Sequence, residues 1–164
     1  MATTALGPSP AHTVGDLPAP GSRAPAFTLV GPDLGELSST DLAGRTVLNI
    51  FPSIGTGVCQ ASVRRFNEVA AGLADTTVLN VSVDLPFALS AFCAAEGIDH
   101  VLVGSAFRSS FGDDYGVRLT DSAFEGLLAR AVVVVDADGT VLHSELVASI
   151  DDEPDYDAAL AALG

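Results

Sequence analysis

Residues 45–73 decide the fold, because a strand pattern passes directly into a helix pattern within RTVLNIFPSIGTGVCQASVRRFNEVAAGL. The segment from Arg45 to Phe51 is largely apolar and β-branched, which is typical of a buried strand, and it stops at Pro52. From Gly57 onward the apolar residues recur at the spacing of one helix face, at Val63, Phe66, Ala70 and Leu73. The sequence therefore predicts a strand-to-helix junction with Cys59 in the first turn of the helix.

The same alternation continues along the chain. Further strands are expected at residues 27–30, 78–83, 101–103, 131–136 and 140–146, and further helices from residue 86 to residue 97 and from 155 to 163. Ala137-Asp138-Gly139 between the last two strands signals a hairpin. This order favours an α/β, thioredoxin-like fold with a central mixed β-sheet and helices on both faces.

The amino-terminal residues differ in composition from the rest. Residues 7–25 hold five of the nine prolines and show no sustained period. We expect an extended N-terminal arm at residues 1–20 and a single thioredoxin-like domain at residues 21–164, a size usual for one domain.

Composition and charge exclude several classes of partner. Hydrophobic residues make up 48% of the chain and charged residues 17%, which indicates a folded core. With 21 acidic and 7 basic residues, the formal net charge of -14 disfavours nucleic acid and anionic membrane surfaces. The longest apolar run, residues 131–135, is far shorter than a membrane span, and the first 20 residues do not resemble a secretory signal. We therefore expect a cytoplasmic protein.

The chain has only two cysteines, Cys59 and Cys93, and such a pair in a cytoplasmic protein is more often catalytic or redox-sensing than structural. The first turn of a helix stabilises a thiolate at Cys59. Lowering a cysteine pKa from ~8.5 to ~6 takes roughly 3.4 kcal/mol, whereas a helix terminus supplies about 0.3–1 kcal/mol, so a cation should assist. The alternative is an inert buried thiol.

Pro52, Thr56 and Cys59 stand in the spacing P-x-x-x-T-x-x-C, and this pattern resembles the active site of the peroxiredoxins. Five segments in order are similar to the thiol peroxidase branch, the atypical two-cysteine peroxiredoxins, and the resemblance covers residues 21–163. These segments are NIFPSIGTGVCQASVRRFN (49–67), DLPFALSAFCAAEGI (84–98), AFRSSFGDDYGV (106–117), GLLARAVVVVD (126–136) and EPDYDAAL (153–160).

The resemblance implies a role for each matching residue. Cys59 would be the peroxidatic cysteine, whose thiolate attacks a peroxide. Thr56 would hydrogen-bond the thiolate and the peroxide, Pro52 would shield the pocket from water, and Arg130 would stabilise the thiolate and the departing oxygen. Arg130 also stands out independently, because an arginine that interrupts an apolar strand must find an anion. A carboxylate at a sheet edge is the alternative partner.

The resemblance makes Cys93 the resolving thiol, which forms an intramolecular disulfide with Cys59 that a thioredoxin-like reductant then reduces. Because the two cysteines stand on separate helices, residues 53–62 and 87–97 would have to unwind locally. The alternative for Cys93 is a packed helix cysteine. One departure from the family is Gly55, where an aspartate is usual.

The implied function is a thiol-dependent peroxidase for hydrogen peroxide and organic hydroperoxides, with no bound cofactor and a homodimer as the assembly. Two alternatives stay open: a peroxiredoxin of another branch with a different resolving thiol, and a non-catalytic peroxide sensor or redox relay. The three histidines and the acidic runs have no metal-ligand spacing, so no metal site is predicted. A cysteine hydrolase would need a histidine beside Cys59, which the sequence does not indicate.

Overall fold

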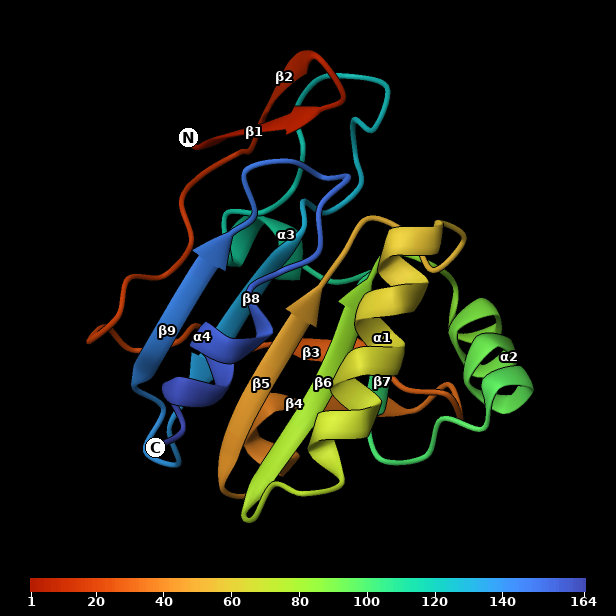
Figure 1. Ribbon diagram of the computed structural model, residues 1–164, viewed down its shortest axis with the longest axis vertical. Helices are drawn as coiled ribbons and strands as arrows, with labels where there is room; N and C mark the ends of the chain where they lie inside the picture. Colours follow the sequence, from red (N-terminus) through yellow and green to blue (C-terminus); the bar gives the residue numbers. More distant parts are fainter.

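A seven-stranded mixed sheet runs through the centre of the computed structural model, which describes residues 1–164 (Figure 1). Its strand order is β4-β3-β7-β6-β5-β8-β9, in which β5, β6 and β7 are parallel and the other pairs antiparallel. The strands are β3 (Thr28–Val30), β4 (Glu36–Ser38), β5 (Arg45–Ile50), β6 (Thr76–Ser82), β7 (Leu102–Ser105), β8 (Ala131–Val135) and β9 (Val141–Leu146). The predicted mixed sheet is confirmed.

Helices cover both faces of this sheet. α1 (Gly57–Ala70) and α4 (Tyr156–Ala161) lie in front of it in Figure 1, and the single turn of α3 (Phe111–Asp114) lies behind it. α2 (Pro86–Glu96) packs on the same side as α1, since its Leu89 joins Val63 of α1 in one apolar cluster. Local signals set the ends of α2: Pro86 opens it, and Gly97 closes it with a φ of 65° that favours glycine.

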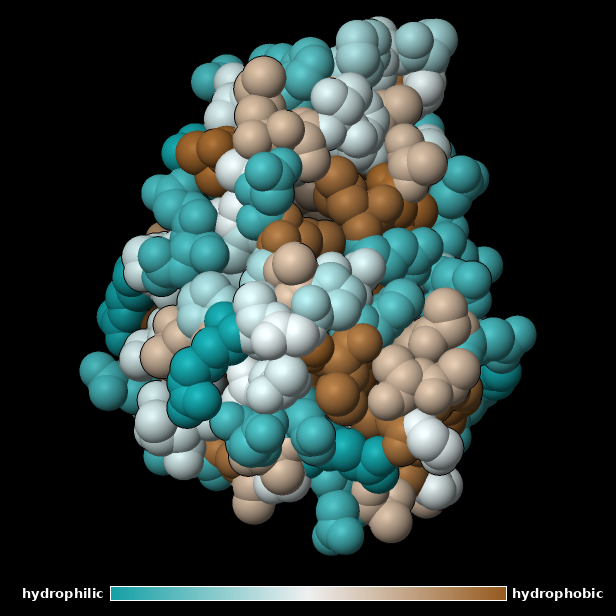
Figure 2. Space-filling view, turned by 90° about the vertical axis from the view of Figure 1, so that its left-hand side faces the viewer, coloured by the Kyte–Doolittle hydropathy of each residue, from teal (hydrophilic) through white to brown (hydrophobic).

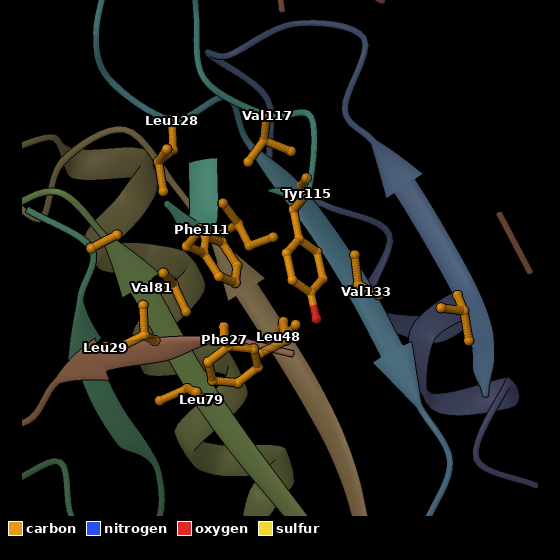
Figure 3. Close-up of a cluster of buried hydrophobic side chains, with 14 residues drawn as sticks. Phe27, Leu29, Leu48, Leu79, Val81, Phe111, Tyr115, Val117, Leu128 and Val133 are labelled. Carbon is orange, nitrogen blue, oxygen red and sulfur yellow. The ribbon is translucent and has the colours of Figure 1, made fainter. Parts of the chain in front are cut away.

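The larger part of the core lies on the face of α3. Phe27, Phe111 and Tyr115 form an aromatic group there, with Phe27 edge-on to Phe111 at 5.6 Å and Phe111 stacked on Tyr115 at 4.4 Å between ring centroids. Figure 3 shows these rings close to Leu48 of β5 and Val133 of β8. Strands β5, β6 and β8 are buried on both faces, which explains their nearly continuous apolar sequences.

The first residues form a hairpin, whereas the sequence predicts no strand before residue 27. β1 (Thr3–Leu6) pairs antiparallel with β2 (Ser9–His12) as a separate two-stranded sheet. Each strand has only four residues, and β2 contains a proline, so the sequence shows no alternation of apolar and polar residues here. Contacts with distant parts of the chain hold the hairpin. Asp121 accepts hydrogen bonds from the backbone nitrogen and Nδ1 of His12, at 2.8 and 2.6 Å.

Other differences from the sequence prediction are small. The strand β4, the short 3₁₀ helix at Ser39–Asp41 and the helix α3 lie in segments where the sequence predicts no helix or strand. β7 runs from Leu102 to Ser105 rather than over residues 101–103, because it pairs with both β6 and β3.

The surface on the side of β9 is largely hydrophilic (Figure 2). Figure 2 views the side that carries β9, and hydrophilic residues surround separate hydrophobic patches there. No helix has the length and apolar character needed to cross a membrane.

Replacing Gly116 with alanine is expected to loosen residues 13–16. Gly116 has a φ of +68°, and a Cβ there would lie 2.3 Å from the backbone oxygen of Asp16. Gly126→Ala is a matched control, since Gly126 has a φ of +90° but a Cβ there would meet nothing within 4 Å. The left-handed backbone costs alanine about 1–2 kcal/mol in either variant. The free energy of unfolding in urea should therefore fall further in Gly116→Ala.

Hydrogen exchange locates this difference. The backbone nitrogen of Val14 donates to the carbonyl oxygen of Arg118 at 2.8 Å, and its protection should fall only in Gly116→Ala. An equal loss of stability in both variants, with Val14 still protected, would contradict this account of how residues 13–16 are held.

Candidate active site

Cys59 lies in the first turn of α1 and is fully buried. The helix begins here because Thr56 caps it: the Thr56 hydroxyl oxygen accepts a hydrogen bond from the backbone nitrogen of Cys59 at 3.4 Å. Cys59 belongs to one buried apolar cluster with residues of the loop after β5, of α1, of α2 and of β7, namely Phe51, Ile54, Val63, Leu89 and Val103. The thiol therefore sits in a dry site at a helix N-terminus, which favours an anion.

Arg130 supplies the cation of this site. Its side chain is 1% exposed, and Nη2 donates to the Cys59 sulfur at 3.2 Å. Nε donates to the carbonyl oxygen of Ile150 at 2.9 Å, while Nη1 is buried and has no hydrogen-bond partner. None of the salt bridges in the structure includes Arg130, so the alternative of a carboxylate partner at the sheet edge is not found.

Strand pairing brings Arg130 to the cysteine from 71 positions away. β8 lies antiparallel beside β5, with Ala131 paired to Ile50. The residue before β8 therefore lies at the same sheet end as the residues after β5, which lead into Cys59. Pro52 is buried directly after β5 at this end, and Thr56 is half-buried, with Oγ1 donating to the carbonyl oxygen of Ser53 at 3.3 Å.

Gly55 is exposed in this loop and has no left-handed backbone conformation. A Cβ at this position would lie 3.3 Å from the Ser53 hydroxyl oxygen, which is a tight contact. The backbone therefore does not require glycine at the position where the family usually has an aspartate.

The sequence patterns do not predict a buried polar network that contacts the first turn of α1. The Ser62 hydroxyl donates to the carbonyl oxygen of Cys59 at 2.8 Å, and Asn49 Nδ2 donates to the Ser62 oxygen at 3.2 Å and to Asn80 Oδ1 at 2.8 Å. All three side chains are fully buried. Asparagines in two otherwise apolar predicted strands are the signal that points to this network, because Asn49 and Asn80 pair in register between β5 and β6.

Cys93 lies on α2, half-buried, and both cysteines are free thiols. It packs against the apolar cluster that surrounds Cys59, and burial raises the pKa of its thiol above the ordinary value. A surface contact also joins the two helices: Arg64 of α1 donates to Glu96 of α2 at 2.6 Å, and its guanidinium lies 5.6 Å from the ring centroid of Phe92.

None of the three histidines is among the residues that bond Cys59 or pack in its cluster. His12 bonds to Asp121, and His100 lies beside Asp99, 3.4 Å from it. No group of three or more histidine, cysteine, aspartate or glutamate side chains is placed to hold a metal ion.

Comparison with known proteins identifies the family. The Redoxin family model matches residues 19–160. A thiol peroxidase of Mycobacterium tuberculosis is 58% identical over 165 residues, which cover 100% of this chain and 99% of that protein. This chain belongs to the thiol peroxidases of the peroxiredoxin family. It is therefore a peroxiredoxin-type peroxidase, as the motif around Cys59 predicts.

Two further relatives agree. A thiol peroxidase of Corynebacterium glutamicum is 57% identical over 164 residues, 99% of each chain. The crystal structure of a peroxiredoxin-like protein from Aquifex aeolicus is 36% identical, covers 99% of this chain and 96% of its own, and superposes with a TM-score of 0.91. The prediction of a thioredoxin-like fold is confirmed.

Replacing Arg130 with glutamine is expected to slow attack on peroxide, because the group that donates to the Cys59 sulfur loses its charge. A charge-assisted hydrogen bond is worth about 1.5–3 kcal/mol, so the attack should slow by about ten- to a hundredfold. Single-turnover consumption of hydrogen peroxide, in a Cys93→Ser background, measures this rate. Arg118→Gln is the control, because Arg118 bonds Asp113 at the surface at 2.6 Å. An unchanged rate in Arg130→Gln would remove Arg130 from the site.

The raised pKa of Cys93 predicts a delayed reaction with alkylating agents. Below the ordinary thiol value of 9.0, Cys93 is protonated in both the folded and the unfolded chain. As the pH rises through this value, the unfolded chain ionises first, so the folded state loses stability and its thiol labels more slowly. Iodoacetamide labelling of Cys59→Ser, folded and in urea, measures this from about pH 7 to about pH 10. Coincident pH profiles would show that burial of Cys93 does not control its reactivity.

Proposed function

We propose that this thiol peroxidase reduces hydrogen peroxide and organic hydroperoxides at Cys59. The observation that carries the proposal is the contact of 3.2 Å between Arg130 Nη2 and the Cys59 sulfur in a buried site. The thiolate attacks the nearer peroxide oxygen, the O–O bond breaks, and the sulfur is oxidised by two electrons to sulfenic acid. The leaving oxygen departs as hydroxide or alkoxide and takes up a proton to become water or an alcohol.

Three neighbours assist this step. Arg130 Nη1 is a buried donor without a partner, so it is available to the peroxide oxygen that gains negative charge. The Thr56 hydroxyl lies at the helix N-terminus, where it aligns the peroxide with the sulfur. Pro52 is buried beside them and has no N–H group to hydrate, so it keeps water away from the thiolate.

Cys93 then resolves the sulfenic acid. Its thiol condenses with Cys59, one S–S bond forms, and one water molecule leaves. A thioredoxin-type dithiol returns both sulfurs to thiols by donating two electrons and two protons. Support comes from two free cysteines that contact one apolar cluster from separate helices. Local unwinding of residues 53–62 and 87–97 brings the sulfurs together.

The same proposal includes the setting in which the enzyme works. Large exposed hydrophobic side chains at Leu85, Phe87 and Phe107 gather at the start of α2 and the end of β7, and they offer a surface for a homodimer. Residues 21–164 are the catalytic domain and residues 1–20 an arm docked on it. Two thiols that must return to the reduced state fit the cytoplasm.

Cys59→Ser is expected to reduce peroxidase activity to the uncatalysed rate, because the attacking sulfur is gone. Cys93→Ser should still consume one peroxide per chain, but it should not turn over with thioredoxin. Peroxide loss, measured with and without thioredoxin and its reductase, separates the two variants. Mass measurement of the Cys59 and Cys93 peptides identifies the oxidised sulfur.

Three outcomes would each contradict one part of the proposal. Normal turnover of Cys93→Ser with thioredoxin would mean that another thiol resolves Cys59, as in another peroxiredoxin branch. Oxidation of Cys59 without sustained peroxide consumption would indicate a sensor or relay. Full activity in Cys59→Ser would exclude Cys59 as the reacting group.

A further inference from the structure

Asp84 holds the loop that leads into Cys59, although it lies 25 positions further along the chain, between β6 and α2. Its Oδ1 accepts a hydrogen bond from the Ser53 hydroxyl at 2.9 Å. Its Oδ2 accepts from the backbone nitrogen of Ile54 at 2.7 Å and from the Ser82 hydroxyl at 2.6 Å. Both carboxylate oxygens are thus bonded, and two of the three donors belong to the loop.

The loop needs hydrogen bonds from other segments because its own sequence restricts the backbone little. Residues 52–58 include two glycines, Gly55 and Gly57, and no charged residue. Ser53 passes the constraint onward: its carbonyl oxygen accepts from the backbone nitrogen of Thr56 at 3.2 Å and from Thr56 Oγ1 at 3.3 Å. Thr56 Oγ1 in turn accepts from the backbone nitrogen of Cys59. A continuous chain of hydrogen bonds therefore runs from Asp84 to Thr56 and Cys59.

The backbone of Asp84 is fixed to the sheet and adjoins the helix of Cys93. The Ser82 hydroxyl oxygen accepts from the Asp84 nitrogen at 3.2 Å, and the Ser105 hydroxyl donates to the Asp84 carbonyl oxygen. Leu85, the next residue, is the N-cap of α2 and its carbonyl oxygen accepts from the Ala88 nitrogen at 3.0 Å. One residue thus joins the ends of β6 and β7, the Cys59 loop and the first turn of α2.

We propose that Asp84 is a positioning residue that acts oppositely on the two oxidative steps. This inference rests on the proposed function. With its carboxylate bonded to Ser53 and Ile54, the loop presents Thr56 and the thiolate in the geometry that peroxide attack needs. The same bonds oppose the unwinding by which Cys59 reaches Cys93, so they slow disulfide formation. Asp84 therefore sets how long the sulfenic acid persists, and with it the exposure of Cys59 to a second peroxide.

The test separates the two steps in a single turnover. The chain has no tryptophan whose fluorescence could report the reaction, so the products are followed by mass spectrometry. Reduced protein is mixed with hydrogen peroxide and quenched at timed intervals. Each sample is then analysed for the Cys59 thiol, sulfenic acid and disulfide. In Asp84→Ala the attack should be about tenfold slower, equivalent to about 1.4 kcal/mol, and the disulfide should form about tenfold faster from the sulfenic acid. Sulfinic acid at high peroxide should decrease.

Three further variants test whether the effect comes from the hydrogen bonds of the Asp84 carboxylate. Asp84→Asn keeps the shape and one acceptor oxygen, so both rates should return toward the wild-type values. Asp41→Ala is the control, because the Asp41 carboxylate accepts from the Ser38 nitrogen at 3.1 Å beyond the other end of β5, and its loss should leave both rates unchanged. Ser53→Ala removes the hydroxyl that bonds Oδ1 and should shift both rates in the same directions as Asp84→Ala, which keeps the test valid if that variant does not fold.

The outcomes distinguish the role of Asp84 from the proposed function on which it rests. Slower attack with faster disulfide formation supports it. A wild-type protein that completes both steps, while Asp84→Ala and Ser53→Ala slow both of them or change neither, overturns the role of Asp84 and leaves the proposed function intact. A wild-type protein that forms no sulfenic acid at Cys59 overturns the proposed function, and the inference with it.

Discussion

A buried guanidinium beside a buried sulfur is the contact on which the site depends. Removing an arginine from water costs several kcal/mol unless anions and acceptors surround it, and here they are the Cys59 sulfur and the Ile150 carbonyl oxygen. The N-terminal hairpin, which the sequence does not predict, holds the segment that contains Ile150. Thr4 Oγ1 donates to the carbonyl oxygen of Val147, and the nitrogen of Ile150 donates to Ala5, both at 2.8 Å. The segment that bonds Arg130 is thus held by the first residues of the chain.

The proposed reaction places two opposed requirements on the Cys59 sulfur. Attack on a peroxide would need a sulfur that is dry and oriented, and the cluster of Phe51, Val63 and Leu89 favours this. The proposed disulfide with Cys93 would need the same sulfur to leave that cluster. The Arg64–Glu96 pair, which joins α1 to α2, is partly solvent-exposed, and pairs of this kind contribute little stability. This contact would therefore not prevent the two helices from separating in the proposed mechanism.

Sequence patterns predicted what local chemistry controls and missed what distant contacts control. The strand before Pro52, the helix that Thr56 caps and the helix between Pro86 and Gly97 all carry strong local signals, and the structure has them within a few residues. Arg130 could also be predicted from the sequence, because an arginine next to an apolar strand requires a partner for its charge. Asp84, Ser62 and the hairpin of residues 3–12 were not, since each is defined by bonds to residues far away in the chain, which no single-sequence period records.

The buried network of Asn49, Ser62 and Asn80 has a consequence for the proposed unwinding of α1. Ser62 bonds both the carbonyl oxygen of Cys59 and the amide of Asn49, which belongs to the central strand β5. In the proposed mechanism, unwinding that reached Ser62 would leave one buried donor hydrogen of Asn49 unpaired, because Asn49 Nδ2 would keep only its bond to Asn80 Oδ1. This loss would cost about 1–3 kcal/mol. The network therefore favours release of only the α1 residues before Ser62, a segment of about one and a half helical turns that includes Cys59.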